Sequence, residues 1–572
     1  MIKKRLFFLF LTAVCVSLLF SSCAKEEEPA DLVLIQGKIV TVDEAKPEAE
    51  ALAVRGDAIA AIGTNAEIEP YIGESTRVID LKGNLAIPGF IDAHAHFTGI
   101  GQAKMGLNLM HVNNWDEVIA MVAEAVKRAQ PGEWIRGRGW HQEKWDRAPE
   151  PNVDGIPLHH ELSRVSPDNP VLLTHASGHA SFANAKAMEL AGITKETPDP
   201  EGGEIVRDAE GNPIGMFRET AQRPMRDAHY AWHETLGAAQ IALERQKVIE
   251  LADKECLSKG ITSVHDPGSP FETIDLFKET VERGELGVRL YVMIRDSNER
   301  IREKIDEYRI IGMGNDHLTV RSIKRSIDGA LGPHGAWLLE PYESLPTSVG
   351  LNTSSVESVK ETAQIAIAHD FQLNVHCIGD RANRETLNIF EGVFNAHPDK
   401  KDLRWRIEHA QHLHPADIPR FMQLGVIPSM QGIHCTSDGP YVIKRLGEER
   451  AEQGAYVWRK LMNTGAVVCN GTDAPVEDVD PIPCFYATVT RKMKDGRAFY
   501  PGQKMTREEA LRSYTINGAY GSFQEDILGS LTPGKLADIT VLSKDIMTVP
   551  EEEILEAEVL YTIVGGKVLY QK

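Results

Sequence analysis

The chain has 572 residues and a formal net charge of −21, with 62 lysine and arginine residues against 83 aspartate and glutamate residues. Because binding to phosphates requires clustered lysine and arginine, this acidic balance argues against nucleic acid as a partner. The seven cysteines are scattered, and the five beyond residue 23 are odd in number, so the sequence does not predict a disulfide framework.

The N-terminal segment has the features of an export signal. Three basic residues at positions 3–5 precede an apolar run over residues 6–20, which is shorter than the roughly 20 residues that a bilayer-spanning helix needs. The small residues before Cys23 resemble a bacterial lipoprotein processing site; an ordinary signal peptide cut nearby is the alternative. We predict a signal peptide over residues 1–22, lipidation of Cys23 and an acidic tether over residues 23–30.

These features predict an exported bacterial lipoprotein of the cell envelope, at the periplasmic face or in the outer membrane. The lipid would be its attachment to the membrane. The acidic run after Cys23 also resembles the surface-export signal of some lipoproteins. The sequence leaves open which membrane face the protein occupies and whether it forms a homo-oligomer.

Both ends of the remaining chain show short β-strand patterns separated by turns. Apolar segments flank Gly37 and Gly56-Asp57 near the start, and a closing hairpin is expected around Gly565-Gly566. Neither end is long enough to bury a good core alone. We therefore predict one composite β-sandwich domain built from residues 31–82 and 525–572.

Residues 83–524 show apolar strand-like segments alternating with helical stretches, the pattern of parallel βα units. Eight such units close a TIM (β/α)8 barrel, whose active site lies at the C-terminal ends of the strands. The candidate strands are residues 86–92, 171–175, 261–266, 319–324, 371–376, 404–409, 425–430 and 466–472. Residues 97–170 and 178–250 are too long for simple connections, and we predict that they are insertions over the barrel mouth.

Five of the predicted strand ends carry residue types that could hold a metal ion. The string Pro-Gly-Phe-Ile-Asp-Ala-His-Ala-His ends in His94 and His96, which lie on one face because side chains alternate along a strand. The other strand ends supply Lys324, His376, His409 and Asp473. Each residue has an ordinary structural alternative, such as a surface lysine or a core histidine, but five coincidences in barrel order favour one site.

These strings resemble the amidohydrolase superfamily of metal-dependent hydrolases, and in particular its N-substituted formamide deformylase-like branch, also called YtcJ-like. The resemblance extends from about residue 31 to residue 572, and further matching segments are Gly137-Arg138-Gly139-Trp140, Ser177-Gly178-His179 and residues 260–266. It implies hydrolysis of a small amide-like compound at a carbon–nitrogen bond other than a peptide bond. It does not identify the substrate.

By this resemblance, His94, His96 and Asp473 would hold one divalent metal, and His376 and His409 a second. Lys324 would bridge them as a carbamate; an unmodified lysine beside a single metal is the alternative. Zinc is the first expectation because histidine-rich sites with carboxylates suit it, although the affinity order admits other divalent ions. Asp473 would act as general base and then general acid for the metal-activated water.

Candidate substrate contacts on the predicted loops are Trp140, His179, His334 and His434, and a plain structural role is the alternative for each. Two other functions remain open from the sequence. The barrel could use its metal for lactone or ester hydrolysis or for isomerisation. It could also belong to an inactive lipid-anchored binding protein, although such a protein should have lost ligands.

Overall fold

The computed structural model describes residues 28–572. The predicted signal peptide and the lipidation site Cys23 lie outside the described residues. Within residues 28–572, no helix combines the length and the apolar character needed to cross a bilayer.

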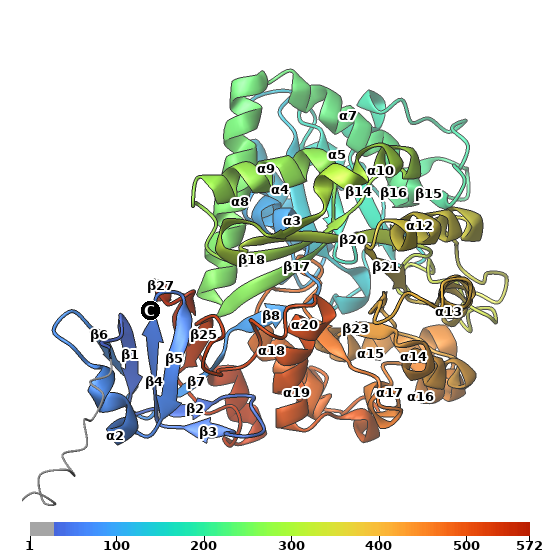
Figure 1. The fold of residues 1–572 in the computed structure, drawn as a ribbon. Coiled ribbons are helices and arrows are strands. Elements are labelled where there is room, and N and C mark those ends of the chain that lie inside the picture. Colours follow the sequence, from blue (N-terminus) through green and yellow to red (C-terminus); the bar gives the residue numbers. More distant parts are fainter. Residues whose placement is uncertain (1–27) are drawn as a thin grey trace, which may run out of the picture.

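The centre of the molecule is a nearly closed parallel barrel, as predicted (Figure 1). Its strands in order are β8 (Phe90–Asp92), β17 (Ile261–Ser269), β18 (Arg289–Ile294), β20 (Leu318–Ser326), β21 (Gln372–Cys377), β22 (Arg406–His409), β23 (Ile427–Gln431) and β24 (Cys469–Gly471). The last strand returns to the first, where the Ala93 N–H donates to the Asn470 carbonyl at 3.1 Å.

Helices alternate with these strands around the outside of the barrel. They include α9 (Phe271–Glu282), α10 (Asn298–Lys304), α12 (Val356–Ala368), α13 (Asp380–Ala396), α14 (Ile418–Leu424) and α15 (Gly432–Leu446). Helix α12 shows why they form: the Ser355 side chain caps its first turn by accepting from the Ser358 N–H. Val359, Ala363 and Ala366 recur at helical spacing and are buried.

The prediction that residues 171–175 form a barrel strand was wrong. This segment is β13 (Val171–His175), which pairs with β10 (Ile135–Trp140) and β14 (Ala180–Ala183) in a separate sheet. The third barrel strand is β18, which the sequence analysis missed. β18 begins at Arg289, a charged residue that interrupts the apolar pattern expected of a buried strand. The buried Arg289 guanidinium is neutralised by Asp538, which lies 2.8 Å away in space but far away in sequence.

As a consequence, the two predicted insertions are one continuous insertion between the barrel strands β8 and β17. It carries a six-stranded sheet in the order β15-β16-β14-β13-β10-β9 and its own hydrophobic core around Trp115, Trp140 and Phe182. β15 (Gly203–Arg207) and β16 (Pro213–Glu219) form a hairpin at one edge of this sheet, and β9 (Leu107–Asn108) lies at the other edge. Helices α7 (Arg223–Glu234) and α8 (Ala238–Ser258) return the chain to the barrel.

Two sheets built from the chain ends lie beside the barrel (Figure 1). One has the order β5-β4-β1-β6 and consists of β5 (Ala58–Gly63), β4 (Ala51–Arg55), β1 (Leu32–Ile35) and β6 (Arg77–Asp80). The other has the order β27-β26-β25-β7-β2-β3 and combines C-terminal strands with N-terminal ones; they include β27 (Lys567–Gln571), β26 (Val559–Val564), β2 (Lys38–Val40) and β3 (Glu48–Ala49). Strand β25 (Ile539–Leu542) pairs antiparallel with β7 (Leu85–Pro88), so the two ends share backbone hydrogen bonds. A single core cluster draws residues from both sheets, including Leu34, Leu52, Ile539 and Ile563.

The predicted strand 86–92 divides at Gly89. Its first part, β7, belongs to the chain-end sheet, and its second part, β8, opens the barrel. A Cβ at residue 89 would lie 2.2 Å from the Thr262 Oγ1, so only glycine allows this close approach between the two sheets. The chain therefore enters the barrel immediately before His94 and His96.

Candidate metal centre at the barrel mouth

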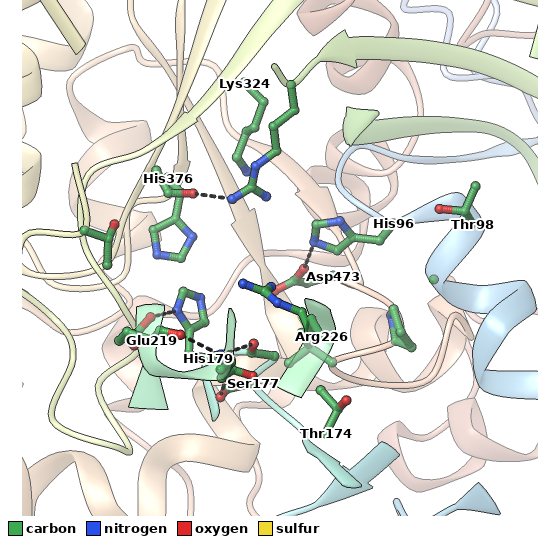
Figure 2. A pocket seen from close by; sticks show the side chains of 18 of the residues that line it. His96, Thr98, Thr174, Ser177, His179, Glu219, Arg226, Lys324, His376 and Asp473 are labelled. Atoms are coloured by element: carbon green, nitrogen blue, oxygen red, sulfur yellow. Dashed lines mark hydrogen bonds and ion pairs between the residues drawn. The ribbon is translucent and has the colours of Figure 1, made fainter. Parts of the chain in front are cut away.

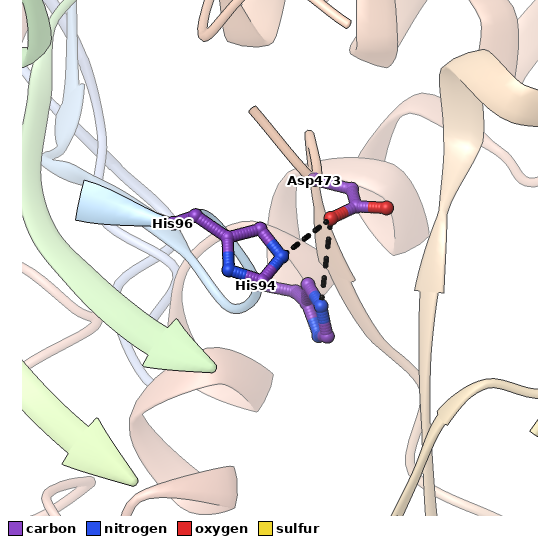
Figure 3. A group of neighbouring side chains, drawn as sticks. All are labelled: His94, His96 and Asp473. Atoms are coloured by element: carbon purple, nitrogen blue, oxygen red, sulfur yellow. Dashed lines mark ion pairs between the residues drawn. The ribbon is translucent and has the colours of Figure 1, made fainter. Parts of the chain in front are cut away.

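The first and last barrel strands bring His94, His96 and Asp473 together (Figure 3). The Asp473 Oδ1 lies 3.3 Å from the His96 Nε2 and 3.6 Å from the His94 Nε2. His94 and Asp473 are buried, whereas His96 is partly exposed. This is the first set of side chains that the sequence predicts to hold a metal.

A second set shares the same carboxylate. His409 is the last residue of β22 and His434 lies in the first turn of α15. Both approach Asp473, at 3.9 Å for the His409 Nδ1 and 4.0 Å for the His434 Nε2. The His376 ring lies next to His409, with centroids 4.4 Å apart. The sequence predicted His434 as a substrate contact; the structure places it among the groups that could hold a metal.

Two of these imidazoles are oriented by a polar partner at their Nδ1. The His94 Nδ1 pairs with Glu408, which is held by the Arg406 guanidinium at 2.7 Å. The His409 Nδ1 lies 2.8 Å from the Gln431 Oε1. Such partners fix the ring and its tautomer, and at His94 the other nitrogen, Nε2, faces Asp473.

The polar atoms that face one another at this point fit a metal ion. The Nε2 atoms of His94, His376 and His434 and the Asp473 Oδ1 are buried and have no hydrogen-bond partner among residues 28–572. Buried polar atoms are rarely left unsatisfied. Converging imidazole nitrogens with one carboxylate are a donor set that suits a divalent ion such as zinc.

The backbone around these residues is also unusual. His409 and Asp473 adopt positive φ values of 74° and 59°, which non-glycine residues rarely do. Asp92 joins the two strand ends by accepting from the His94 N–H at 3.0 Å and from the Thr472 hydroxyl at 2.6 Å. Such strain costs about 1–3 kcal/mol per residue and is concentrated at functional sites.

Lys324 projects from β20 toward the same space (Figure 2). Its side chain is buried, and its amine has no hydrogen bond or ion pair with the described residues. Burial, together with the charges of Arg295 and Arg406, lowers the pKa of Lys324 to about 8, against the opposing effect of Glu408 and Asp473. A substantial fraction of the amine is therefore neutral near pH 8.

These residues open into a cavity of about 830 Å³, whose wall includes His96, Lys324, His376, His409 and Asp473. The insertion covers the other side and contributes Ser177, His179 and Glu219 (Figure 2). A smaller cavity of about 50 Å³ adjoins it, and His179, His376 and Asp473 line both. His434 lines the smaller one.

The four predicted substrate contacts are placed differently from one another. His179 and His434 line the cavities, as a substrate contact must. Trp140 is fully buried in the core of the insertion, where its indole N–H donates to the Leu173 carbonyl at 3.0 Å. His334 lies off both cavity walls and bonds to the Ser344 hydroxyl at 3.1 Å, while its neighbour Pro333 lines the smaller cavity.

The sequence analysis missed Glu219. Its carboxylate lies 2.8 Å from the His179 Nδ1 and is nearly enclosed, and its backbone has a φ of 48°. Gly329 and Gly335 pack against it so closely that a Cβ at either would approach the Glu219 Oε1 within 2.5 Å. No local motif marks a glutamate at the end of a hairpin strand, so the sequence offered no signal for it.

Comparison with known proteins identifies the family of this chain. Residues 77–570 match the model of the amidohydrolase family. The chain is 32% identical to Protein LONG AFTER FAR-RED 3 of Arabidopsis thaliana, covering 95% of this chain and 92% of that protein. It is 29% identical to the putative amidohydrolase YtcJ of Bacillus subtilis, and 28% identical to the N-substituted formamide deformylase of Arthrobacter pascens; coverage is 94–95% of this chain and 98% of each relative.

A solved structure agrees with these relatives. An uncharacterised metal-dependent hydrolase from Pyrococcus horikoshii superimposes with a TM-score of 0.71 and 25% identity, covering 91% of this chain and 99% of that one. The resemblance inferred from the sequence is therefore confirmed, as is the expectation of a metal-dependent enzyme. The chain belongs to the amidohydrolase family and is a metal-dependent hydrolase that acts on carbon–nitrogen bonds other than peptide bonds.

Proposed function

We propose that the residues converging on Asp473 carry out the hydrolysis of an amide-type bond in a small molecule. The observation that carries this proposal is the pair of buried Nε2 atoms of His94 and His434, which lie 3.6 and 4.0 Å from Asp473 and have no hydrogen-bond partner among residues 28–572. His94, His96 and Asp473 would hold one divalent metal, and His376 and His409 a second. When bound, such a metal lowers the pKa of water and polarises a carbonyl.

Asp473 has the position and the charge to move the proton. Although its burial opposes ionisation, the contact with His96 and the neighbouring imidazoles hold the pKa of Asp473 well below its usual value. The carboxylate is therefore ionised at neutral pH and can accept a proton from the attacking water. It then donates this proton to the leaving nitrogen, acting as general base and afterwards as general acid.

We further propose that Lys324 carries a carbamate when metal is bound. The neutral amine forms a new N–C bond with carbon dioxide and releases one proton. The buried, unpartnered Lys324 amine and its depressed pKa support this step, since only the neutral amine is nucleophilic. The resulting carboxylate would lie on the cavity wall beside His376 and His409.

Metal analysis and a substrate panel test this function together. The purified protein should bind one or two equivalents of a divalent metal, with zinc as the first expectation. The metal-loaded protein should hydrolyse members of a panel of N-formyl amines, N-acyl amines and hydantoins, while lactones serve as the comparison class. Loss of activity with a chelator and its return with zinc would support the proposal, and hydrolysis of lactones alone would contradict it.

The Lys324 carbamate has its own test. Lys324→Ala should lose metal and activity together, and short carboxylic acids should restore part of both by supplying the missing carboxylate. A holo structure with an unmodified Lys324 amine far from the metal would rule the carbamate out.

We also propose that the two chain-end sheets form one β-sandwich domain over residues 31–82 and 525–572, with the barrel and its insertion over residues 83–524. Their shared core around Leu34, Leu52, Ile539 and Ile563 supports this division. Deleting residues 525–572 should then leave residues 31–82 without a folded partner. Protection of their amides from hydrogen exchange in the truncated chain would contradict the proposal.

Export as a lipoprotein remains a proposal that rests on the N-terminal sequence. Residues 1–22 would be removed, and Cys23 would anchor the protein in the cell envelope. Cys23→Ala should release the protein from the membrane fraction or block its processing. Unchanged membrane association, with no lipid on the N-terminal peptide by mass spectrometry, would contradict it.

A further inference from the structure

The cavity wall is unusually rich in arginine for so acidic a chain. The arginines that line it are Arg136, Arg138, Arg226, Arg295 and Arg325. None of the five forms an ion pair with a carboxylate in the described part of the chain. The insertion supplies three of them and the barrel supplies two, so they surround one opening from both sides.

The polar contacts of these arginines go to neutral acceptors. Arg138 donates to the carbonyls of Pro475 and Ala176, both at 3.0 Å. Arg325 donates to the Lys324 carbonyl at 3.0 Å, and also to the Thr362 hydroxyl and the Asn298 side chain. These contacts orient the guanidinium groups without neutralising their charge.

The remaining three arginines have even fewer contacts. Arg295 reaches only the Ser326 hydroxyl, at 3.4 Å. Arg136 and Arg226 form no side-chain hydrogen bond or ion pair with residues 28–572. Figure 2 shows Arg226 projecting from the insertion into the space between His179, His96 and Asp473.

Arg226 and Arg295 also repel each other. Although part of the Arg295 side chain stays exposed to solvent, the surrounding cavity wall and the nearby Arg226 charge lower the pKa of Arg295. The carboxylates along the same wall are engaged elsewhere: Glu219 with His179, Asp296 with Arg300, Glu361 with Arg302, and Asp473 with His94 and His96. Glu299 lies in the first turn of α10 and pairs with none of the five arginines.

We propose that the substrate carries a carboxylate that binds Arg226 and Arg295 while its amide bond lies at Asp473. This inference rests on the proposed function and specifies its substrate class as N-acylated amino acids or similar anionic amides. A guanidinium group matches the planar geometry of a carboxylate and binds it with two parallel hydrogen bonds. An anion between the two arginines would also reduce their mutual repulsion, which the charge of Asp266 offsets in part.

A matched pair of compounds tests the inference on the metal-loaded protein. N-formyl-phenylalanine, as both enantiomers, differs from N-formyl-phenethylamine only by its carboxylate. We expect the carboxylated member to bind more tightly in calorimetry and to react with about 10–100-fold higher kcat/KM, the value of hydrogen bonds to a charged group. This preference should weaken at high salt because the two arginines are exposed to solvent.

Variants test whether Arg226 and Arg295 cause the preference for the carboxylated compound. Arg226→Gln and Arg295→Gln should each remove most of the preference for the carboxylated compound, mainly through its KM. Arg223→Gln is the matched control, because Arg223 lies one turn away on α7, pairs with Asp227 and does not line the cavity. It should behave as the wild type with both compounds.

The outcomes separate this inference from the proposed function. Equal binding and equal hydrolysis of the two compounds would overturn the carboxylate inference and leave the amidohydrolase function standing. Tight, arginine-dependent binding of the carboxylated compound without hydrolysis of any amide would support the inference and contradict the proposed reaction. Absence of any charge-selective binding by the wild type would also overturn the inference.

Discussion

The two walls of the cavity differ in how firmly their side chains are held. On the barrel side, the His94 Nδ1 pairs with the Glu408 carboxylate and the His409 Nδ1 lies 2.8 Å from the Gln431 Oε1. On the insertion wall, Arg136 and Arg226 have no polar partner in the described residues, although both line the same space. The barrel wall is thus pre-organised for chemistry, whereas the insertion wall keeps free groups with which to bind a substrate.

This difference between the two walls predicts that the largest loss of activity follows from a substitution on the barrel wall, at Asp473. Asp473→Asn keeps an oxygen for the metal but is a poor base at neutral pH, so kcat should fall by about 10²–10⁴-fold. The protein should remain folded and retain most of its metal. Steady-state kinetics with metal analysis of the same sample would check this.

Two other results would change the role of Asp473. Loss of metal together with activity would mean that its contribution as a ligand dominates. Near-normal kcat with unchanged metal content would show that Asp473 is not the group that moves the proton.

The second prediction removes the partner of a ligand rather than the ligand. Gln431→Leu takes away the group that lies 2.8 Å from the His409 Nδ1 and should weaken metal binding by about 10–100-fold. Metal affinity can be measured by competition with a chelator. Gln453→Leu, at an exposed glutamine that bonds to Glu449, is the control and should leave the affinity unchanged. An unchanged affinity for Gln431→Leu would show that the barrel wall does not depend on this contact.

The third prediction separates the core of the insertion from its cavity wall. Trp140→Phe removes the indole N–H that donates to the Leu173 carbonyl, and the free energy of unfolding should fall by about 1–3 kcal/mol. Because Trp140 lines neither cavity, kcat and KM should stay unchanged. His179→Gln should show the reverse pattern, with altered kinetics and a smaller effect on stability. A changed KM for Trp140→Phe would restore its predicted role in substrate binding.

The fourth prediction concerns the joint between insertion and barrel. Asp253 in α8 accepts from the N–H groups of Gly287 and Val288, just before β18, at 2.9 and 2.8 Å. Burial raises the pKa of Asp253 to about 6, against the opposing effect of these hydrogen bonds. The contribution of its protonated form to stability is therefore complete below about pH 4 and is lost as the pH rises through about 6.

Asp253→Asn should remove this pH dependence, which amounts to about 2–3 kcal/mol for a shift of two pKa units. The difference in unfolding free energy between variant and wild type should grow from pH 4 to pH 7 in favour of the variant. Denaturant unfolding at several pH values measures it, with the exposed Asp399→Asn as control. Parallel pH profiles for Asp253→Asn and wild type would contradict the expectation.

Local geometry explains which parts of the site were predictable. His94 and His96 are two residues apart beyond a strand, and alternation along a strand places such residues on one face. Lys324, His376, His409 and Asp473 were predicted because each lies at or beside a strand end, and parallel strands in a barrel end at the same rim. The metal-type cluster therefore follows from backbone regularity.

The strand predictions were wrong where contacts between residues far apart in sequence determine which strands pair. Residues 171–175 have the apolar pattern of a buried strand, but their partners are β10 and β14 rather than barrel strands. β18 was missed because its first residue, Arg289, is charged, and its neutralising partner Asp538 is 249 residues away. Burial of a strand depends on its neighbours in space, which the apolar pattern does not specify.

The amino-acid sequence by itself determined the amidohydrolase barrel and the residues at its strand ends, because alternation and strand order are local and repeat along the chain. Only the tertiary structure revealed the orienting partners of His94 and His409, the enclosed Glu219 and the arginine-lined part of the mouth. These groups come from segments far apart in sequence, and their chemistry depends on burial and on the absence of a counter-charge. Both properties exist only after the insertion has packed over the barrel.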